Sequence, residues 1–435
     1  MYNRYLMIYY TLPKNNANVQ INPICKSAAR PHTISISHSV HYYNNIIQHQ
    51  IENLLLQQNG SATNAIQHFN QVALHVNPHE FLFTAVPSHR TSIGKMEDGA
   101  PETYELIEVV NLCNLLDSTH CGKTCSMLHI GALAHSMPLS TVIKDFALCN
   151  HFIEPSVSDL ARALAFTENL DSEDSEEEEN LEEMFGPDLL NTSPPVRRNS
   201  FKDPTNVRFP SKFEVLFFNF HFQKTTVEIF FQELLYCVYI LLRIQAEGGA
   251  CIIKIDGLHC KIMIDILFIL NSLYSKVCII KPSCSSPLSS TRYLVCKQYA
   301  PKPFIHTLMV VLHAIICSVP SQFVSSLIDE QIPLHFINKL EEIDVIIGQQ
   351  QMEAYCQIIN VLKHKNKEDK LELYKRNNLI KCVQWCEKYH IPHNKLQEKG
   401  NSFTQKQTLK NTFMHKLCDE EKTEHEPSQS HSQLG

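Results

Sequence analysis

Apolar and polar positions in the second half of the chain change between the period of a strand and the period of a helix. The short apolar run CIIKI at 251–255 has the length and β-branched content of a buried strand. After it, apolar residues recur with the 3.6-residue period of a helix that lies on a sheet, at Ile262, Ile266, Ile269, Leu270 and Leu273. VCIIK at 277–281 predicts a second strand, ended by a proline, and YLVC at 293–296 predicts a third. The order strand, helix, strand, loop, strand indicates an α/β sheet.

Further elements of such a sheet are predicted upstream. The strongly apolar FEVLFFNFHF at 213–222 predicts a strand, and 225–249 predicts a long helix with a threonine cap and a Gly-Gly stop. SMLHI at 126–130 predicts a short strand followed by a turn at Gly131. Apolar residues at helical spacing predict a helix over 104–116.

The two ends of the chain have different patterns. Residues 1–48 are rich in Asn, Ser, His and Tyr without sustained periodicity, so we expect an irregular or partly disordered lead-in. Two helices are predicted over 45–76, and HEFLFTAV at 79–86 is expected to be a strand or extended segment. Three stretches of helical period follow residue 300, and the polar tail 396–435 is expected to be disordered.

The acidic segment 168–200 interrupts this pattern. It contains EDSEEEENLEE and ends in a basic exit at Arg197 and Arg198. Because like charges repel and few apolar residues are present to be buried, we expect a solvated, mobile insertion. An acidic docking segment, or phosphorylation at Ser172 or Ser175, is the alternative interpretation.

The region 248–299 resembles the C-terminal half of the FtsJ-like (RrmJ-like) ribose 2'-O-methyltransferases, which include viral and eukaryotic mRNA cap methyltransferases. In that family a lysine strand introduced by Gly-Gly is followed by a helix, a strand ending in Lys-Pro, a serine-rich loop and a last strand. The residues that fall in place here are Gly248, Gly249, Lys254, Lys281, Pro282, Ser289, Ser290 and Tyr293.

The resemblance implies a Rossmann-like α/β methyltransferase sheet with helical N- and C-terminal extensions. The expected division is an irregular and helical extension at 1–103, the methyltransferase domain at 104–299 with its acidic insertion, and a helical region at 300–395. Such a domain would use S-adenosylmethionine. In the family the cofactor's methionine moiety lies against a small-residue turn after the first strand, here Gly131, Ala132, Leu133 and Ala134. An ordinary strand-to-helix turn is the other interpretation of these residues.

The family's active site is a Lys-Asp-Lys-Glu tetrad, in which the second lysine takes the proton of the ribose 2'-hydroxyl. Lys254 matches that lysine, whereas Asn219 stands at the aspartate position and Thr291 at the glutamate position. The first lysine would fall near Glu105, with Lys95 upstream. One of the four positions is therefore retained. His221, Asp256 or Glu228 are alternatives that would replace the lost carboxylate.

Two functional hypotheses follow from the resemblance. The first is an S-adenosylmethionine-dependent RNA ribose 2'-O-methyltransferase acting on mRNA caps, with a viral origin of the protein as one expectation. The second is a catalytically impaired descendant that binds RNA or serves as a scaffold for a protein partner. Whether the chain is an enzyme stays open at this level.

Composition restricts where an RNA-binding surface can lie and in which compartment the protein is expected. The 435-residue chain has a net charge of −7, much of it in the acidic segment, so an RNA-binding surface must be local. The sixteen cysteines are scattered, as is typical of buried thiols in a reducing compartment, and no long uncharged apolar run predicts a membrane span. We expect an intracellular protein, cytoplasmic or nuclear.

We expect no metal site. Cys382, Cys386, His390 and His393 have donors suited to zinc, but the first three lie along one helical stripe of about 12 Å, too long for one ion to bridge. A helix face with buried cysteines is the preferred interpretation. Signatures of serine hydrolases, of phosphate-binding loops and of CxxC pairs are absent from the sequence.

Overall fold

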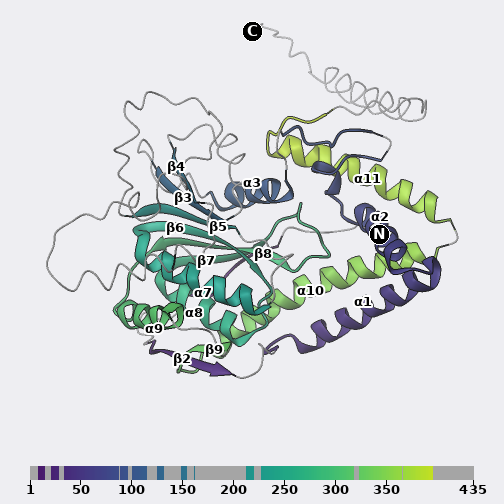
Figure 1. The fold of residues 1–435 in the computed structure, drawn as a ribbon. Coiled ribbons are helices and arrows are strands. Elements are labelled where there is room, and N and C mark those ends of the chain that lie inside the picture. Colours follow the sequence, from purple (N-terminus) through teal and green to yellow (C-terminus); the bar gives the residue numbers. More distant parts are fainter. Residues whose placement is uncertain are drawn as a thin grey trace, which may run out of the picture. The chain divides into compact units, whose positions relative to one another are not determined.

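The computed structural model describes residues 8–14, 21–28, 34–87, 89–96, 100–114, 125–131, 148–153, 161, 212–219, 227–317, 323–364 and 366–394. Residues Met1–His393 form one compact unit, and the description below concerns that unit. It is a mixed α/β structure with a mixed sheet and helices, compatible with a Rossmann-like fold (Figure 1).

The main sheet has seven strands in the order β1-β7-β8-β6-β5-β3-β4. The strands β3, β4, β5 and β6 pair in parallel, and β8 runs antiparallel to its neighbours β6 and β7. At the edge, β1 is antiparallel to β7. The bounds are β1 Ile8–Thr11, β3 Cys125–Gly131, β4 Leu148–Ile153, β5 Phe213–Asn219, β6 Gln245–Asp256, β7 Tyr274–Lys281 and β8 Thr291–Tyr299.

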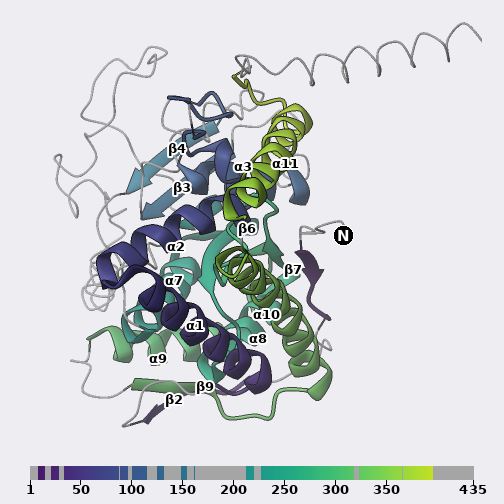
Figure 2. The ribbon, with the colours of Figure 1, turned by 90° about the vertical axis from the view of Figure 1, so that its right-hand side faces the viewer.

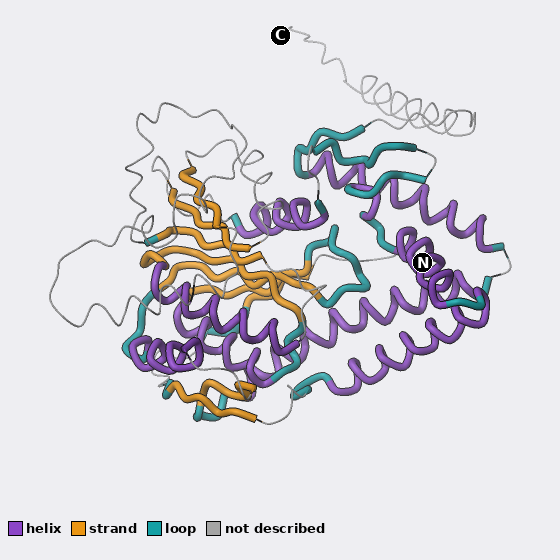
Figure 3. Tube along the Cα trace, viewed as in Figure 1, coloured by secondary structure: helices purple, strands orange, loops and turns teal. Residues whose placement is uncertain are grey.

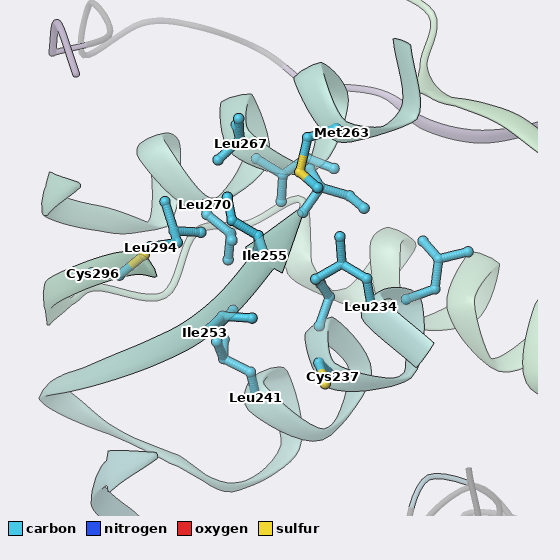
Figure 4. Packing of buried hydrophobic residues seen from close by; sticks show 14 of the residues in the cluster. Leu234, Cys237, Leu241, Ile253, Ile255, Met263, Leu267, Leu270, Leu294 and Cys296 are labelled. Carbon is cyan, nitrogen blue, oxygen red and sulfur yellow. The ribbon is translucent and has the colours of Figure 1, made fainter. Parts of the chain in front are cut away.

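Three helices, α7 (Val227–Ile244), α8 (Lys261–Leu273) and α9 (Ile305–Cys317), lie on one side of this sheet (Figure 3). Alternate residues of β6 point toward them, so Ile253 and Ile255 join the same buried cluster as Leu241 of α7 and Leu267 of α8 (Figure 4). α8 is buried almost all round, which explains its nearly unbroken apolar sequence. Lys254, between the two isoleucines, must point to the opposite side of the sheet.

Helix α3 (Pro101–Cys113) lies on that opposite side, and a helical group extends from it. This group consists of α1 (His38–Asn59), α2 (Ala62–Val76), α10 (Leu334–Leu362) and α11 (Lys367–Lys388), which Figure 2 shows in one view. α1, α2 and α10 share a second apolar cluster around Leu55, Val72 and Ile358. The helices α1 and α10 approach closely at Gly348, where an added Cβ would lie 2.2 Å from Cγ1 of Val40.

The described N-terminal residues contradict the expected irregular lead-in. β1 extends the main sheet, and β2 (Pro23–Ala28) pairs antiparallel with β9 (Phe323–Ile328) in a separate two-stranded sheet. Both are short edge strands whose partners lie far away in the sequence, so their pattern alone is weak. β4 and β9 were likewise not predicted.

Two further predictions were wrong in detail. Residues 79–86 hold a 3-10 turn, η1 (Glu80–Leu82), instead of a strand. The Gly-Gly pair does not stop α7, because that helix ends at Ile244 and β6 begins at the next residue. Gly248, with φ 77°, lies where the β5–β6 register shifts, and a side chain at Gly249 would collide with the carbonyl oxygen of Glu214.

The remaining expectations agree with the structure or fall outside it. The predicted helices agree with α1 and α2 for 45–76, with α3 for 104–116 and with α8 for 262–273. The region after residue 300 contains α9, α10 and α11. Several predictions concern parts of the chain outside the described residues, namely the acidic segment, the tail, Ala132, Ala134 and His221. Among the described helices, none combines the length and apolarity needed to cross a membrane.

Candidate active site

The candidate site lies where the chain order of the parallel strands reverses. From β3 the chain passes to β4 on one side and then returns to β5 on the other side. In open α/β sheets the crevice outside the carboxyl ends of strands at such a point is where ligands bind. β3 ends at Gly131 and β5 ends at Asn219, and these two residues are register partners.

A row of residues continues from Asn219 across the sheet. Phe218 is paired with Ile253, so Asn219 lies beside Lys254, and Lys254 is in turn the register partner of Tyr293 on β8. Lys254 is only 6% exposed. Lys254 thus lies on a central strand near its carboxyl end and beside Asn219, as predicted, whereas the direction of its side chain into a cleft at that edge stays a prediction.

A carboxylate from helix α3 contacts this lysine. Lys254 Nζ donates to Oε1 of Glu102 at 3.3 Å, and the two side chains are 8% and 18% exposed. Such a pair lies largely out of solvent, where charge interactions are stronger than at the surface. Helix α3 therefore supplies the negative charge that the sequence lacks at positions 219 and 291.

Glu105, one turn further along α3, is also part of the site. The hydroxyl of Tyr293 donates to its Oε2 at 2.7 Å. Burial raises the pKa of Glu105, and Lys254 and the Tyr293 hydrogen bond offset part of that rise. Glu105, near which the resemblance would put the first lysine, thus brings a carboxyl group and not a second cation. Lys95 is exposed, and its backbone N–H donates to the carbonyl oxygen of Pro392.

Asn219 and Thr291 differ in whether their side chains already have a hydrogen-bond partner in the described structure. The amide nitrogen of Asn219 is buried and has no hydrogen-bond partner among the described residues, which marks it as a donor for a bound group. Thr291 is paired with Asp256, not with Lys254, and its Oγ1 accepts from Ser289 Oγ at 2.8 Å. Thr291 is therefore the first residue of β8, and its side chain is hydrogen-bonded to the loop before that strand, outside the row.

One of the suggested substitutes is described by its contacts. The carboxylate of Asp256 accepts a hydrogen bond from the hydroxyl of Ser290, just before β8. The side chain of Glu228 lies outside the description. Glu102 was missed because it precedes the predicted start of the helix; the signal was its spacing of three residues from Glu105, which puts both on one helix face.

Lys281, at the Lys-Pro of the motif, has a structural role. Its Nζ donates to the carbonyl oxygens of Ser286, Ser289 and Thr291, at 3.2, 2.7 and 3.3 Å. Burial, and then the Arg292 guanidinium, lower the pKa of Lys281 to about 8. Through these three hydrogen bonds the Lys281 amine fixes the serine-rich loop between β7 and β8.

Glu108 fixes the same loop from the other side. This fully buried carboxylate accepts hydrogen bonds from the Ser283 backbone at 2.8 Å, the Ser283 hydroxyl at 3.0 Å, the Cys284 backbone at 3.3 Å and the Trp385 indole at 3.1 Å. α3, the loop and α11 are joined through it. The helix that carries Glu102 and Glu105 is therefore rigidly placed over the sheet edge.

The zinc alternative fails on the geometry. Cys382 and Cys386 are fully buried, and burial raises the pKa of the Cys386 thiol to about 11, which opposes formation of a thiolate ligand. The Cys382 thiol contacts the carbonyl oxygen of Pro78. In the part of the chain that the structure describes, these cysteines do not gather with His390 and His393 into a group of metal-binding side chains.

Two described features at the strand ends are relevant to a cofactor. β3 ends in a glycine, and its register partner Asn219 has an amide nitrogen without a hydrogen-bond partner among the described residues. Both features lie at the switch point of the sheet. The other two cofactor candidates, Ala132 and Ala134, are not described.

Comparison with known proteins gives a short partial similarity. No protein-family model matches the chain. Over 76 residues it is 34% identical to cap-specific mRNA (nucleoside-2'-O-)-methyltransferase 1 of Homo sapiens, and 33% and 32% identical to the proteins of the same name from Bos taurus and Drosophila melanogaster. Each match covers 17% of this chain and 9% or 10% of the relative. The similarity supports a methyltransferase-like function.

Proposed function

We propose that this protein is an S-adenosylmethionine-dependent ribose 2'-O-methyltransferase that acts on capped RNA. The observation that carries the proposal is the Lys254–Glu102 pair at the carboxyl edge of a central strand, in line with Asn219 and Tyr293. The short similarity to cap methyltransferases supports the substrate class.

Lys254 acts as the general base in this proposal. The Lys254 ammonium first releases a proton to solvent; its neutral amine then accepts the proton of the ribose 2'-hydroxyl, and the carboxylate of Glu102, 3.3 Å from Nζ, stabilises the ammonium group that forms again. When bound, S-adenosylmethionine supplies a methyl group activated by its sulfonium centre. Glu102 and Glu105 on α3 thereby take over the role of the carboxylates that the family carries on its strands.

The other residues of the row bind the cofactor or the ribose and orient the carboxyl group of Glu105. Asn219 offers its amide N–H, which has no partner among the described residues, to an acceptor on the cofactor or the ribose, and Gly131 is its register partner on β3. Tyr293 holds the Glu105 carboxyl group at 2.7 Å. The side chains of Asn219, Lys254 and Tyr293 are all buried, which keeps water from competing for the hydroxyl proton.

The domain division follows from this proposal. The catalytic domain spans about 104–299 and takes Glu102, the partner of Lys254, from the end of the extension at 1–103. A helical region at 300–395 follows, and RNA is the partner. Capped RNA is found in the nucleus and the cytoplasm, so the protein acts in one of these compartments.

A second candidate function is a non-catalytic RNA-binding or scaffolding subunit. It is favoured by the neutral Asn219 at the aspartate position and by Thr291, whose hydroxyl is used within its own loop. In this case the fold holds RNA or a protein partner, and the Lys254–Glu102 pair only stabilises the domain.

A radiolabelled methyl-transfer assay on capped RNA separates the two candidates. We expect methyl transfer by the full chain and a loss of roughly 10²–10⁴-fold in rate for Lys254→Ala, the usual cost of removing a general base. Lys302→Ala, at an exposed lysine before α9, is the control and should keep the full rate. No transfer by the natural protein, or a rate that Lys254→Ala leaves unchanged, would overturn the catalytic assignment.

Calorimetric titration with S-adenosylmethionine shows which step a variant affects. Glu102→Gln should retain the cofactor affinity and lower the rate, because Glu102 acts on the lysine. If the natural protein binds the cofactor without transferring methyl groups, the double variant Asn219→Asp, Thr291→Glu tests whether restored carboxylates give activity.

A further inference from the structure

Three side chains with metal-binding donors meet on the described part of the chain, away from the Lys254–Glu102 pair. They are His41 of α1, His259 of the loop between β6 and α8, and Asp344 of α10. One ligand atom from each lies within 4.8 Å of the other two, and Nε2 of His41 is 2.9 Å from Oδ2 of Asp344. They come from three elements that are far apart in the sequence.

We propose that His41, His259 and Asp344 bind a divalent transition-metal ion, with zinc the ion that fits best. Two imidazoles and one carboxylate are a donor set that Zn²⁺ takes, with a water molecule at the fourth position. Hard ions such as Mg²⁺ prefer sites built from oxygen ligands, so two imidazoles argue against them.

The Asp344 carboxylate is oriented for this role. Arg292 donates from Nη1 to Oδ1 of Asp344 at 3.0 Å, in a pair whose side chains are almost fully buried. The second oxygen, Oδ2, is left toward His41 and is the ligand atom. Orientation of a ligand carboxylate by such a partner is a regular feature of metal centres.

His259 has a polar atom with no other use. Its Nδ1 is buried and lacks a hydrogen-bond partner among the described residues, which costs free energy unless a bound group satisfies it. Its ring lies 4.1 Å from the ring of His41, measured between centroids. The side chain of His41 is 22% exposed and gives an ion a route from solvent, whereas Asp344 is 1% exposed.

The position of the site indicates what the ion does. His259 follows β6, the strand of Lys254, after a turn at Gly257 with φ 70°, and its carbonyl oxygen accepts from the backbone of Ser35. An ion held here fastens α1 and α10 to the loop that leaves the lysine strand. Its role is structural and does not depend on the proposed function.

The test is metal titration of the full chain after treatment with a chelator. We expect one equivalent of Zn²⁺ to bind and to raise the thermal midpoint. With Co²⁺ as a probe we expect visible d–d bands without the intense near-ultraviolet band of cysteine ligation. Failure of the chelated protein to bind one equivalent of either ion, or a cobalt spectrum dominated by sulfur ligation, overturns the proposal.

Variants locate the ion. His41→Gln and His259→Gln should each weaken Zn²⁺ binding by more than about tenfold, since even changes behind the ligands cost roughly 10–100-fold. His49→Gln is the matched control, because His49 lies on the same helix and pairs with Glu52 at 3.1 Å but has no third donor beside it among the described residues. If the His259→Gln variant folds and its zinc affinity is unchanged, the assignment of His259 as a ligand is wrong. If that variant does not fold, the cobalt spectrum of the natural chain decides whether the ligands are imidazole and carboxylate groups.

Discussion

At the scale of single residues, the candidate site carries its negative charge in an unexpected place. The strand positions that would hold carboxylates have Asn219 and Thr291, while Glu102 and Glu105 approach Lys254 from helix α3. A charge needed next to a lysine is defined by distance and burial, so a residue of another element can supply it.

The buried Glu105 gives a prediction at this scale. Its pKa is raised in the folded protein, so above the unfolded value of about 4.3 the folded state keeps a proton that the unfolded chain releases. The stability contribution of Glu105 therefore falls as the pH rises through that window. Glu105→Gln, which can still accept from Tyr293, should match the natural protein near pH 4 and become relatively more stable toward neutral pH.

Urea unfolding at several pH values checks this expectation. Glu353→Gln, an exposed change on α10, serves as the control and should not alter the pH profile. A stability difference between Glu105→Gln and the natural protein that is constant with pH would refute the explanation.

At the scale of elements, α3 is the part whose position matters most for the site. It is fixed by Glu108, whose carboxylate accepts hydrogen bonds from the loop after β7 and from Trp385 of α11. The aromatic rings of Trp385 and Tyr104 lie 5.6 Å apart, measured between centroids, and add packing between α11 and α3.

Truncation of Glu108 should loosen these three elements together. We expect Glu108→Ala to lower the free energy of unfolding by about 3 kcal/mol or more, because buried N–H donors lose their acceptor. Trp385→Phe keeps one aromatic ring but loses the indole N–H and part of the buried ring volume, so a smaller loss of about 1–3 kcal/mol is expected. Glu342→Ala, in an exposed pair with Lys339, should change stability by less than about 0.5 kcal/mol in the same denaturant titration. Equal effects of Glu108→Ala and Glu342→Ala would contradict the role of Glu108.

At the scale of the whole molecule, the N-terminal residues are part of the fold. β1 pairs with β7 in the main sheet, β2 pairs with β9, and α1 packs on α10 and α2. The chain from Met1 to His393 is one compact unit, so the helical regions and the sheet stabilise each other.

The acidic segment is expected to be dispensable for that stability. Deletion of residues 171–195 should leave the thermal midpoint nearly unchanged, because a highly charged sequence with few apolar residues contributes little buried surface. Circular dichroism melts of the deletion variant and the full chain give the comparison. A fall of many degrees would show that the segment packs against the rest.

The sequence by itself determined the elements with strong periodicity and the place of Lys254. The helices α8, α10 and α11 and the strands β5 to β8 are long or strongly apolar, so local pattern suffices to predict them. The tertiary structure alone decided the short edge strands β1, β2 and β9, the approach of Glu102 to Lys254, and the meeting of His41, His259 and Asp344. These features depend on contacts between residues up to about 300 positions apart, and neither period nor composition carries information on which distant side chains the packing brings together.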